Sequence, residues 1–270
     1  MPKGITLSLA DPAGETMLSK FRERGFKEKE KNVLTKGDKI ILVMDHLIVP
    51  EERFLKNLTP QPYPADYTRI ASEHELEYIV VASRHWAASG RPSLTAHPTG
   101  NFGKAMYGGN PKELQMTAPN PMRNIYTKML DSPPEGFQVS LETTHHSPTE
   151  FDVPMFFVEI GSREEQWRDE NVARYLVDCI LEGMDSKEEA PVAIGFGGGH
   201  YCPKFSELIQ DYAMGHMAAK YAIELLNEDL ILQMVEKSQG IDKVLLDKGL
   251  KGKHKRIVMG FLSSVGIEVE

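Results

Sequence analysis

Histidine side chains are concentrated at the ends of several apolar segments of this sequence. Of the nine histidines, five lie at or just after segments that we expect to form buried strands. In open α/β sheets, ligands bind in the crevice beyond the carboxyl ends of the strands, so histidines from several strand ends can converge there. Imidazole is a preferred ligand of zinc, and a catalytic zinc ion keeps one coordination position for water. The sequence therefore predicts a metal-assisted hydrolytic site with five candidate metal ligands: His85, His97, His145, His146 and His200.

The segment Glu142-Thr-Thr-His145-His146 gives the strongest of these signals. Residues four apart in an extended strand share a face, so Glu142 and His146 point the same way, whereas His145 points to the opposite face unless the strand bends at Thr144. A lone histidine at a strand end is more often structural, so the informative feature is the combination of several imidazoles with a carboxylate. We predict Glu142, His146 and His200 as catalytic groups. A zincin is excluded because the sequence has no His-Glu-x-x-His signature.

A glycine-rich turn, Gly195 to Gly199, follows an apolar segment and directly precedes His200. It is not a dinucleotide-binding fingerprint, because His200 occupies the third glycine position, and it is not a P-loop, because no Gly-Lys-Ser/Thr ends it. Two interpretations remain open: a tight strand-to-helix turn, or a nest of backbone N–H groups that holds a phosphate, carboxylate or oxyanion. On the second interpretation, the substrate-binding candidates are Gly197, Gly198, Gly199 and, after His97, Asn101 and Lys104.

His216 is a second-line site residue. Four apolar or aromatic neighbours share its face at helical spacing: Ile209, Tyr212, Ala213 and Met217. This pattern favours a buried histidine with a hydrogen-bond partner in the core. Gly215 beside it indicates a close approach or a helix break, which keeps His216 among the candidates.

The segments that must position these residues alternate between strand-like and helix-like patterns. A helix is predicted by capping-box spacing at Ser162 to Glu165, an apolar stripe from Ala173 to Leu181 and a stop at Gly183. A longer helical stretch begins near Ser206 and runs, with a break, towards Glu236. Short apolar runs predict strands at Lys39 to Val49, Leu76 to Ser83, Pro92 to His97, Phe137 to Thr144, Met155 to Ile160 and Pro191 to Phe196. This alternation predicts an α/β fold with a mostly parallel or mixed sheet.

The region from Ser83 to Arg123 is long and rich in Gly, Pro and His, and long loops of this kind are usually functional. Three prolines within Gly108 to Arg123 predict a loop with at most a short helix. No segment has the composition of a linker. We therefore expect one domain spanning residues 1–270, with an elaborated loop region around 83–123.

The composition sets limits on partners and location. A formal net charge of -8 argues against a protein whose whole surface binds nucleic acid, although Lys248 to Arg256 is purely basic and Lys20 to Lys31 is partly so. Neither a signal peptide nor an apolar run long enough to span a membrane is recognisable. The two cysteines, Cys179 and Cys202, are too few for a disulfide framework and fit a reducing, cytoplasmic setting.

Taken together, four blocks and Gly215-His216 resemble the archaeal and plant type of D-aminoacyl-tRNA deacylase. The blocks are Ser83-Arg-His85 with Ser89-Gly90, His97 to Gly103, Glu142 to Glu150, and Gly195 to Phe205. The similarity runs in order from about Lys39 to the C-terminus. It implies an esterase that removes D-amino acids from transfer RNA (tRNA), depends on zinc (one or two ions) and has a three-layer α/β/α fold of the phosphorylase/hydrolase-like kind. We expect tRNA as the substrate and a monomer.

Two alternatives stay open. A zinc-dependent peptidase or amidase, or a phosphorylase-like enzyme, on the same fold would carry similar site chemistry. A non-catalytic tRNA-binding protein would use the histidines only structurally, and metal content would separate that case from the first two.

Overall fold

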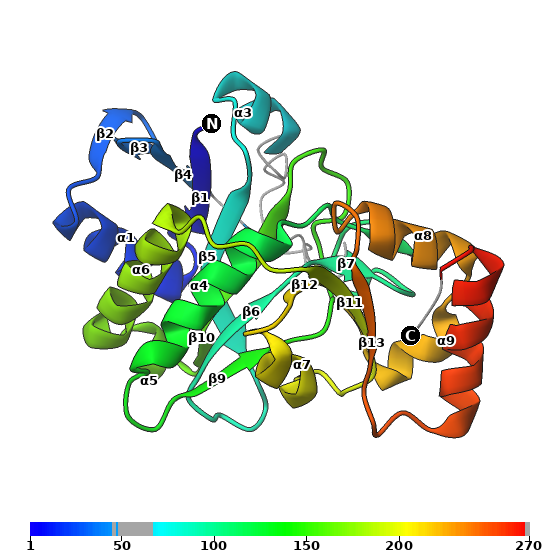
Figure 1. The fold of residues 1–270 in the computed structure, drawn as a ribbon. Helices are drawn as coiled ribbons and strands as arrows, with labels where there is room; N and C mark the ends of the chain where they lie inside the picture. Colours follow the sequence, from blue (N-terminus) through cyan, green and yellow to red (C-terminus); the bar gives the residue numbers. More distant parts are fainter. Residues whose placement is uncertain (45–46, 48–66, 268–270) are drawn as a thin grey trace.

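The computed structural model describes residues 1–44, 47 and 67–267. Within these residues the main sheet has eight strands in the order β2-β3-β4-β1-β5-β10-β6-β9 (Figure 1). Their bounds are β1 Lys3–Ser8, β2 Lys27–Glu30, β3 Val33–Lys36, β4 Lys39–Met44, β5 Ile79–Trp86, β6 Ser93–His97, β9 Gln138–Leu141 and β10 Met155–Ser162. Strands β4, β1, β5 and β10 run parallel, whereas β6 is antiparallel to β10 and parallel to β9. The sheet is therefore mixed.

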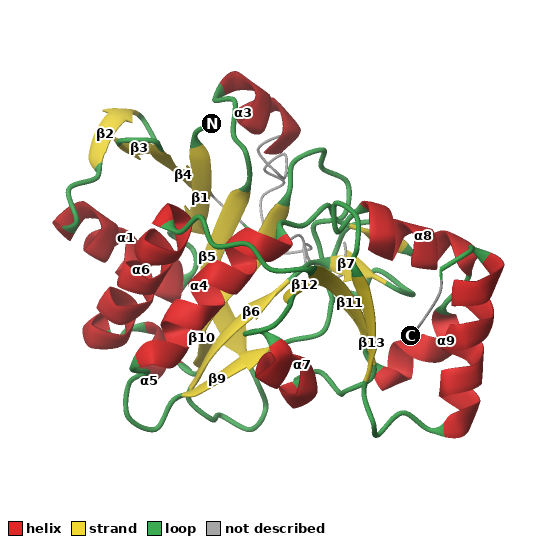
Figure 2. Cartoon of the chain, viewed as in Figure 1, coloured by secondary structure: helices red, strands yellow, loops and turns green. Residues whose placement is uncertain are grey.

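Helices cover one face of this sheet: α1 Pro12–Glu23, α4 Pro119–Asp131, α5 Glu164–Trp167 and α6 Glu170–Asp185 (Figure 2). Side chains alternate between the two faces of a strand. In β10, Phe156, Val158 and Ile160 pack into the large core beneath these helices, while Met155 and Phe157 join a second apolar cluster on the opposite face. That cluster includes Ala71 of the short helix α3 (Tyr67–Glu73). The predicted layered α/β architecture with a mixed sheet is confirmed.

A smaller parallel sheet, β12-β11-β13, lies on the C-terminal side of the molecule (Figure 1). The elements of this part are β11 Val192–Phe196, α7 Pro203–Leu208, β12 Ala213–Ala218, the 3-10 helix η1 Lys220–Leu225, α8 Glu228–Glu236, β13 Lys243–Leu246 and α9 Gly252–Ser264. Its own apolar core includes Phe196, Ile223 and Val258. Met214 and Met217 of β12 also join the large core, so apolar packing continues between the two parts.

Five predicted strands correspond to β4, β5, β6, β10 and β11, and the sixth is shorter than expected because β9 ends at Leu141. Positions 45, 46, 48 and 49 of the predicted first strand lie outside the described residues. The two-stranded sheet formed by β7 (Gly100–Asn101) and β8 (Glu113–Leu114) lies within the predicted loop region. Among the described residues, every helix is too short or too polar to span a lipid bilayer.

The predicted helical stretch from Ser206 to Glu236 is wrong. It contains α7, strand β12, η1 and α8 instead, so His216 lies in a strand. All six residues of β12 are buried, and a strand buried on both faces gives a continuous apolar run that periodicity cannot distinguish from a helix. Gly215 marks a close approach, because a Cβ there would lie 2.2 Å from Ser238 Oγ.

Three further helix predictions need correction. Gly183 does not stop α6, which runs to Asp185; it allows α4 to approach, since a Cβ there would lie 2.5 Å from Ile125 Cα. The predicted capping box lies one residue later than expected. Ser162 belongs to β10, and the side-chain oxygen of Gln166, in place of Glu165, accepts a hydrogen bond from the backbone N–H of Arg163 at 3.0 Å. The segment Gly108 to Arg123 also includes the start of α4, a helix of 13 residues, because prolines are tolerated in the first helical turn.

Candidate active site

A buried carboxylate, Glu159, lies at the centre of the sheet face opposite the large helical layer. In the strand register Glu159 pairs with Ser83 of β5 on one side and with Thr95 of β6 on the other. The Ser83 hydroxyl donates to Glu159 Oε1 at 2.7 Å, and the Thr95 hydroxyl donates to Oε2 at 3.4 Å. The hydroxyl groups of two neighbouring strands thus hold this buried carboxylate in a fixed position.

His85 and His97 flank this carboxylate from the two neighbouring strands. His85 pairs with Gly161, two residues beyond Glu159, and His97 pairs with Phe157, two residues before it. His85 Nδ1 lies 3.5 Å and His97 Nε2 3.6 Å from Glu159 Oε2. Because β6 is antiparallel to β10, these histidines meet over the face of the sheet and not only at the carboxyl edge of parallel strands, as the sequence had suggested.

A second carboxylate, Glu142, brings the loop histidines to the same place. Its side chain is fully buried one residue beyond the end of β9. Glu142 Oε1 lies 3.1 Å from His85 Nδ1, while Oε2 lies 3.1 Å from His200 Nε2 and 3.5 Å from His145 Nε2. The structure therefore brings together all five predicted histidines with Glu142.

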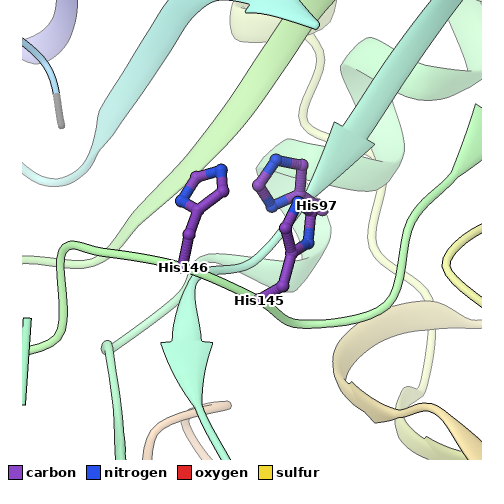
Figure 3. Close-up of side chains that lie close together, drawn as sticks. All are labelled: His97, His145 and His146. Carbon is purple, nitrogen blue, oxygen red and sulfur yellow. The ribbon is translucent and has the colours of Figure 1, made fainter. Parts of the chain in front are cut away.

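His145 and His146 both face the cluster, because β9 has already ended and the chain turns at His146, whose φ is 45°. Figure 3 shows their rings beside that of His97, with centroids 4.2 Å (His97–His145), 4.8 Å (His97–His146) and 4.4 Å (His145–His146) apart. His145 and His146 would lie on opposite faces only in an extended strand, and the chain is not extended here.

Backbone carbonyls set the tautomers of three of these imidazoles. The Nδ1 atoms of His97, His145 and His146 lie 3.1, 2.7 and 2.6 Å from the carbonyl oxygens of Pro98, Thr143 and Ser147. A ring nitrogen that faces a carbonyl must donate, which leaves the lone pair on Nε2 free to bind a cation. This is the arrangement of second-layer hydrogen bonds that orients histidine ligands in metal sites.

The side-chain atoms of the cluster offer candidate ligand sets for a metal ion. Three sets, each with its ligand atoms within 4.8 Å of one another, are His97–His145–His146, His85–Glu142–His200 and His97–Glu142–Glu159. Two ligands of one tetrahedral zinc ion are about 3.3 Å apart, since each lies about 2.0–2.1 Å from the metal. His97 Nε2 and both Glu142 oxygens are buried without a hydrogen bond of acceptable geometry. Such atoms are costly to bury unless they bind a further group.

The electrostatics of the cluster divide the histidines into two kinds. Burial, the largest effect, disfavours the charged forms of His85 and His97, yet hydrogen bonds and the charges of the two carboxylates outweigh it and raise both pKa values. Burial lowers the pKa of His146 to about 3, and burial with the charges of neighbouring histidines lowers that of His145 well below its usual range. The lowered pKa values of His145 and His146 favour the neutral form that binds a metal ion, whereas His97 would release a proton on binding one.

The glycine turn directly precedes His200, and two of its backbone N–H groups donate hydrogen bonds within the protein. The N–H of Gly197 donates to Ala218 O at 2.8 Å, and that of Gly199 donates to Tyr201 O at 3.1 Å. Gly197 and Gly198 have φ values of 124° and 76°, which glycine adopts readily. These contacts favour the interpretation as a tight turn, and a substrate-binding role for the three glycines stays a prediction.

The remaining predicted residues lie apart from the imidazole cluster or support it. The Asn101 amide donates to Gly108 O and Asn110 O, so it holds the loop, while the Lys104 side chain is exposed. His216 is buried, with its ring nitrogens 3.1 Å from Thr144 Oγ1 and 2.9 Å from Gln115 O. The interpretation as a hydrogen-bonded core histidine agrees with these contacts, through which His216 supports the segment that carries His145.

Two residues of the site were not predicted. Glu159 could have been found as the only charged residue in the apolar strand Met155–Ile160. The Tyr201 hydroxyl lies 2.8 Å from His85 Nε2, and the Tyr201 backbone forms a bridge with Glu142. Only the position of Tyr201 directly after His200 could have indicated this contact.

The sequence of this chain is similar to those of known proteins. A family model described as D-aminoacyl-tRNA deacylase matches residues 72–270. A D-aminoacyl-tRNA deacylase of Thermococcus onnurineus is 35% identical over 282 residues, covering 98% of this chain and 98% of that protein. Another, from Pyrococcus horikoshii, is 32% identical with 98% of both chains covered.

The fold also has a match among solved structures. The crystal structure of a conserved protein of unknown function aligns with a TM-score of 0.82 and 28% identity, covering 99% of this chain and 94% of that one. The similarity includes nearly every residue of this chain, so it extends to the smaller sheet as well as the main one.

Proposed function

Because the chain belongs to the D-aminoacyl-tRNA deacylase family, we propose that it hydrolyses the ester bond between a D-amino acid and the 3′ end of tRNA. The family membership confirms the resemblance seen in the sequence motifs. The observation that carries the proposal is the convergence of five imidazoles on two buried carboxylates, whose side-chain atoms form three candidate sets of metal ligands. Such a cluster suits the activation of water and the polarisation of a carbonyl group.

We propose zinc as the cofactor, held by His97, His145 and His146. The carbonyl contacts at their Nδ1 atoms support this choice over the other two sets. When bound, zinc supplies a Lewis acid for the ester carbonyl and lowers the pKa of water to about 7. Glu159 then acts from the sheet face by fixing His97 and His85.

Glu142 and His200 are positioned for the two proton transfers of ester hydrolysis. As a water oxygen bonds to the carbonyl carbon, Glu142 Oε2 accepts the proton that the water loses. Glu142 passes this proton to His200 Nε2, 3.1 Å away, and His200 donates it to the ribose oxygen as the bond from that carbon to this oxygen breaks. His200 suits this role because its side chain is 40% exposed and lies 3.1 Å from Glu142. Free amino acid and a tRNA hydroxyl result.

The tRNA itself requires a basic surface, and we propose the segment Lys248 to Arg256 at the start of α9. Lys248, Lys251, Lys255 and Arg256 are exposed. Among the described residues, Lys253 and His254 of this segment share one carboxylate partner, Glu224, at 2.6 and 3.6 Å. The charges of the other basic segment, Lys20 to Lys31, are largely offset by acidic residues. Lys20 pairs with Glu23 and Glu170, Arg24 pairs with Asp178, and β2 alternates Lys with Glu.

The experiment that tests the activity compares D- and L-aminoacyl-tRNA carrying the same amino acid. Release of the D-amino acid at a rate far above spontaneous hydrolysis, with little release of the L-amino acid, is the expected result. Binding of tRNA without hydrolysis would favour the non-catalytic alternative. Cleavage of an amide or peptide substrate in place of the ester would favour a peptidase or amidase.

A further inference from the structure

A cavity of about 750 Å³ runs along the outer edge of β9, the last strand of the main sheet. Its walls come from α4 and α7, from β9 itself and from the loop between β5 and β6. Binding pockets for small organic ligands have volumes of about 300–1,000 Å³. The cavity is therefore large enough for a nucleotide.

The cavity borders the imidazole cluster directly. Three consecutive residues of β9 line it, Gln138, Val139 and Ser140, and Glu142 follows two residues after them in the sequence. Tyr201 forms part of its wall, and the hydroxyl of Tyr201 lies 2.8 Å from His85 Nε2. Ser93 also lines the cavity, and a Cβ on Gly161 would lie 2.5 Å from Ser93 Oγ and 2.8 Å from His85 Cδ2. A ligand in the cavity thus lies next to the reacting groups.

Its lining combines apolar and aromatic walls with groups that form directional hydrogen bonds. Tyr126, Leu130 and Val139 provide apolar surface, and the Gln138 and Gln210 amides each offer a donor and an acceptor. Ser93 is only 4% exposed, and its hydroxyl has no hydrogen-bond partner among the described residues.

A single positive charge lies at this cavity. Arg91 lines it, is exposed and has no carboxylate partner within the described part of the chain. The one acidic residue of the lining, Glu207, lies 3.5 Å from Lys204 and is thereby offset.

We propose that this cavity binds the 3′-terminal adenosine nucleotide of the tRNA, with Arg91 at its phosphate. The inference rests on the proposed function. The ester carbonyl has an amino acid on one side and ribose on the other, and only one of these can occupy this cavity. The nucleotide is constant among substrates and carries a phosphate and a hydrogen-bonding base. An amino-acid side chain varies and needs neither a cation nor fixed amides.

The probe is adenosine 5′-monophosphate, whose binding is measured by calorimetry on the full chain without any turnover. Replacing Leu130 by Trp places an indole in the cavity and should weaken this binding at least 10-fold. Replacing Gln138 and Gln210 together by Ala should have a similar effect. Arg91→Ala should weaken binding of the monophosphate at least 5-fold but leave binding of uncharged adenosine within 2-fold.

Matched controls are Leu232→Trp on α8 and Arg22→Ala on α1, both at exposed positions away from the cavity. Both should bind the nucleotide like the parent. In the deacylation assay, Leu130→Trp should raise KM for D-aminoacyl-tRNA at least 10-fold, with a smaller change in kcat.

Two results would overturn the assignment: no saturable binding of the nucleotide to the parent, or equal binding to parent and cavity variants. Saturable binding of free D-tyrosine that Leu130→Trp abolishes, with nucleotide binding unchanged, would assign the cavity to the amino acid. Failure of the proposed function gives a different pattern, because it would remove deacylation in the parent while nucleotide binding and its response to the variants remained.

Discussion

His145 and His146 are neighbours in the sequence, yet both imidazoles face the same cluster, with ring centroids 4.4 Å apart and planes at 74°. The positive φ of His146 redirects the chain, and two carbonyl oxygens, from Thr143 and Ser147, face the Nδ1 atoms. Two adjacent residues can therefore bind one ion together with His97.

Replacing His146 and His200 separately by Ala should separate metal binding from proton transfer. His146→Ala should lose bound zinc and reduce kcat/KM for D-aminoacyl-tRNA at least 100-fold, because a ligand is removed. His200→Ala should keep most of the zinc but lose about 100-fold in kcat, a common contribution of a general acid. Zinc analysis and single-turnover kinetics measure these effects, with His74→Ala as the control outside the cluster. Full activity in both variants would refute the roles given to these histidines.

Glu159→Gln removes the charge at the sheet centre while keeping the shape of the side chain. Its ion pairs hold His85 and His97, so we expect a 10- to 100-fold loss in zinc affinity or activity, as for other residues that orient metal ligands. Competition with a chromogenic chelator measures the affinity. The exposed Glu165→Gln provides the control. Unchanged affinity and kcat in a folded Glu159→Gln protein would show that the sheet carboxylate has no part in the site.

The turn before His200 offers a matched pair of glycines. Gly198 has a φ of 76°, so Gly198→Ala should cost about 1–2 kcal/mol in the free energy of unfolding and displace His200. Gly199→Ala should be tolerated, because a Cβ there meets only Tyr201 O at 3.7 Å. Denaturant unfolding and kcat measure both effects. Equal stability and activity in the two variants would contradict the assigned role of the turn.

The sequence patterns predicted the site better than the smaller sheet. The five histidines and Glu142 could be identified because each lies at or near the end of an apolar segment that indeed forms a strand. Strand β12 could not be identified, because burial on both faces gives it no alternation. The position of Glu159 depends on the register of β10 with β5 and with β6. Its contacts with Ser83 and Thr95 join residues 76 and 64 positions apart in the sequence, which sequence patterns do not pair.

Changing Lys251, Lys253 and Lys255 together to Glu should weaken tRNA binding across all tRNA species. Each phosphate contact contributes roughly 0.7 to 0.9 to the slope of log affinity against log salt, so this slope should also flatten. The control is the same triple change at Lys27, Lys29 and Lys31, which are exposed on β2 or next to it. Filter binding at several salt concentrations measures both. Equal slopes for the parent and the α9 variant would exclude this segment from the tRNA interface.

The most direct test of the account is to remove metal from the protein and then restore it, while following hydrolysis of D-aminoacyl-tRNA. Our account predicts that dialysis against a chelator lowers kcat/KM at least 100-fold and that stoichiometric zinc restores it. The His97→Ala protein should stay inactive after the same addition. Full activity in protein with less than about a tenth of an equivalent of metal would contradict the account and indicate metal-free acid–base catalysis by the same histidines.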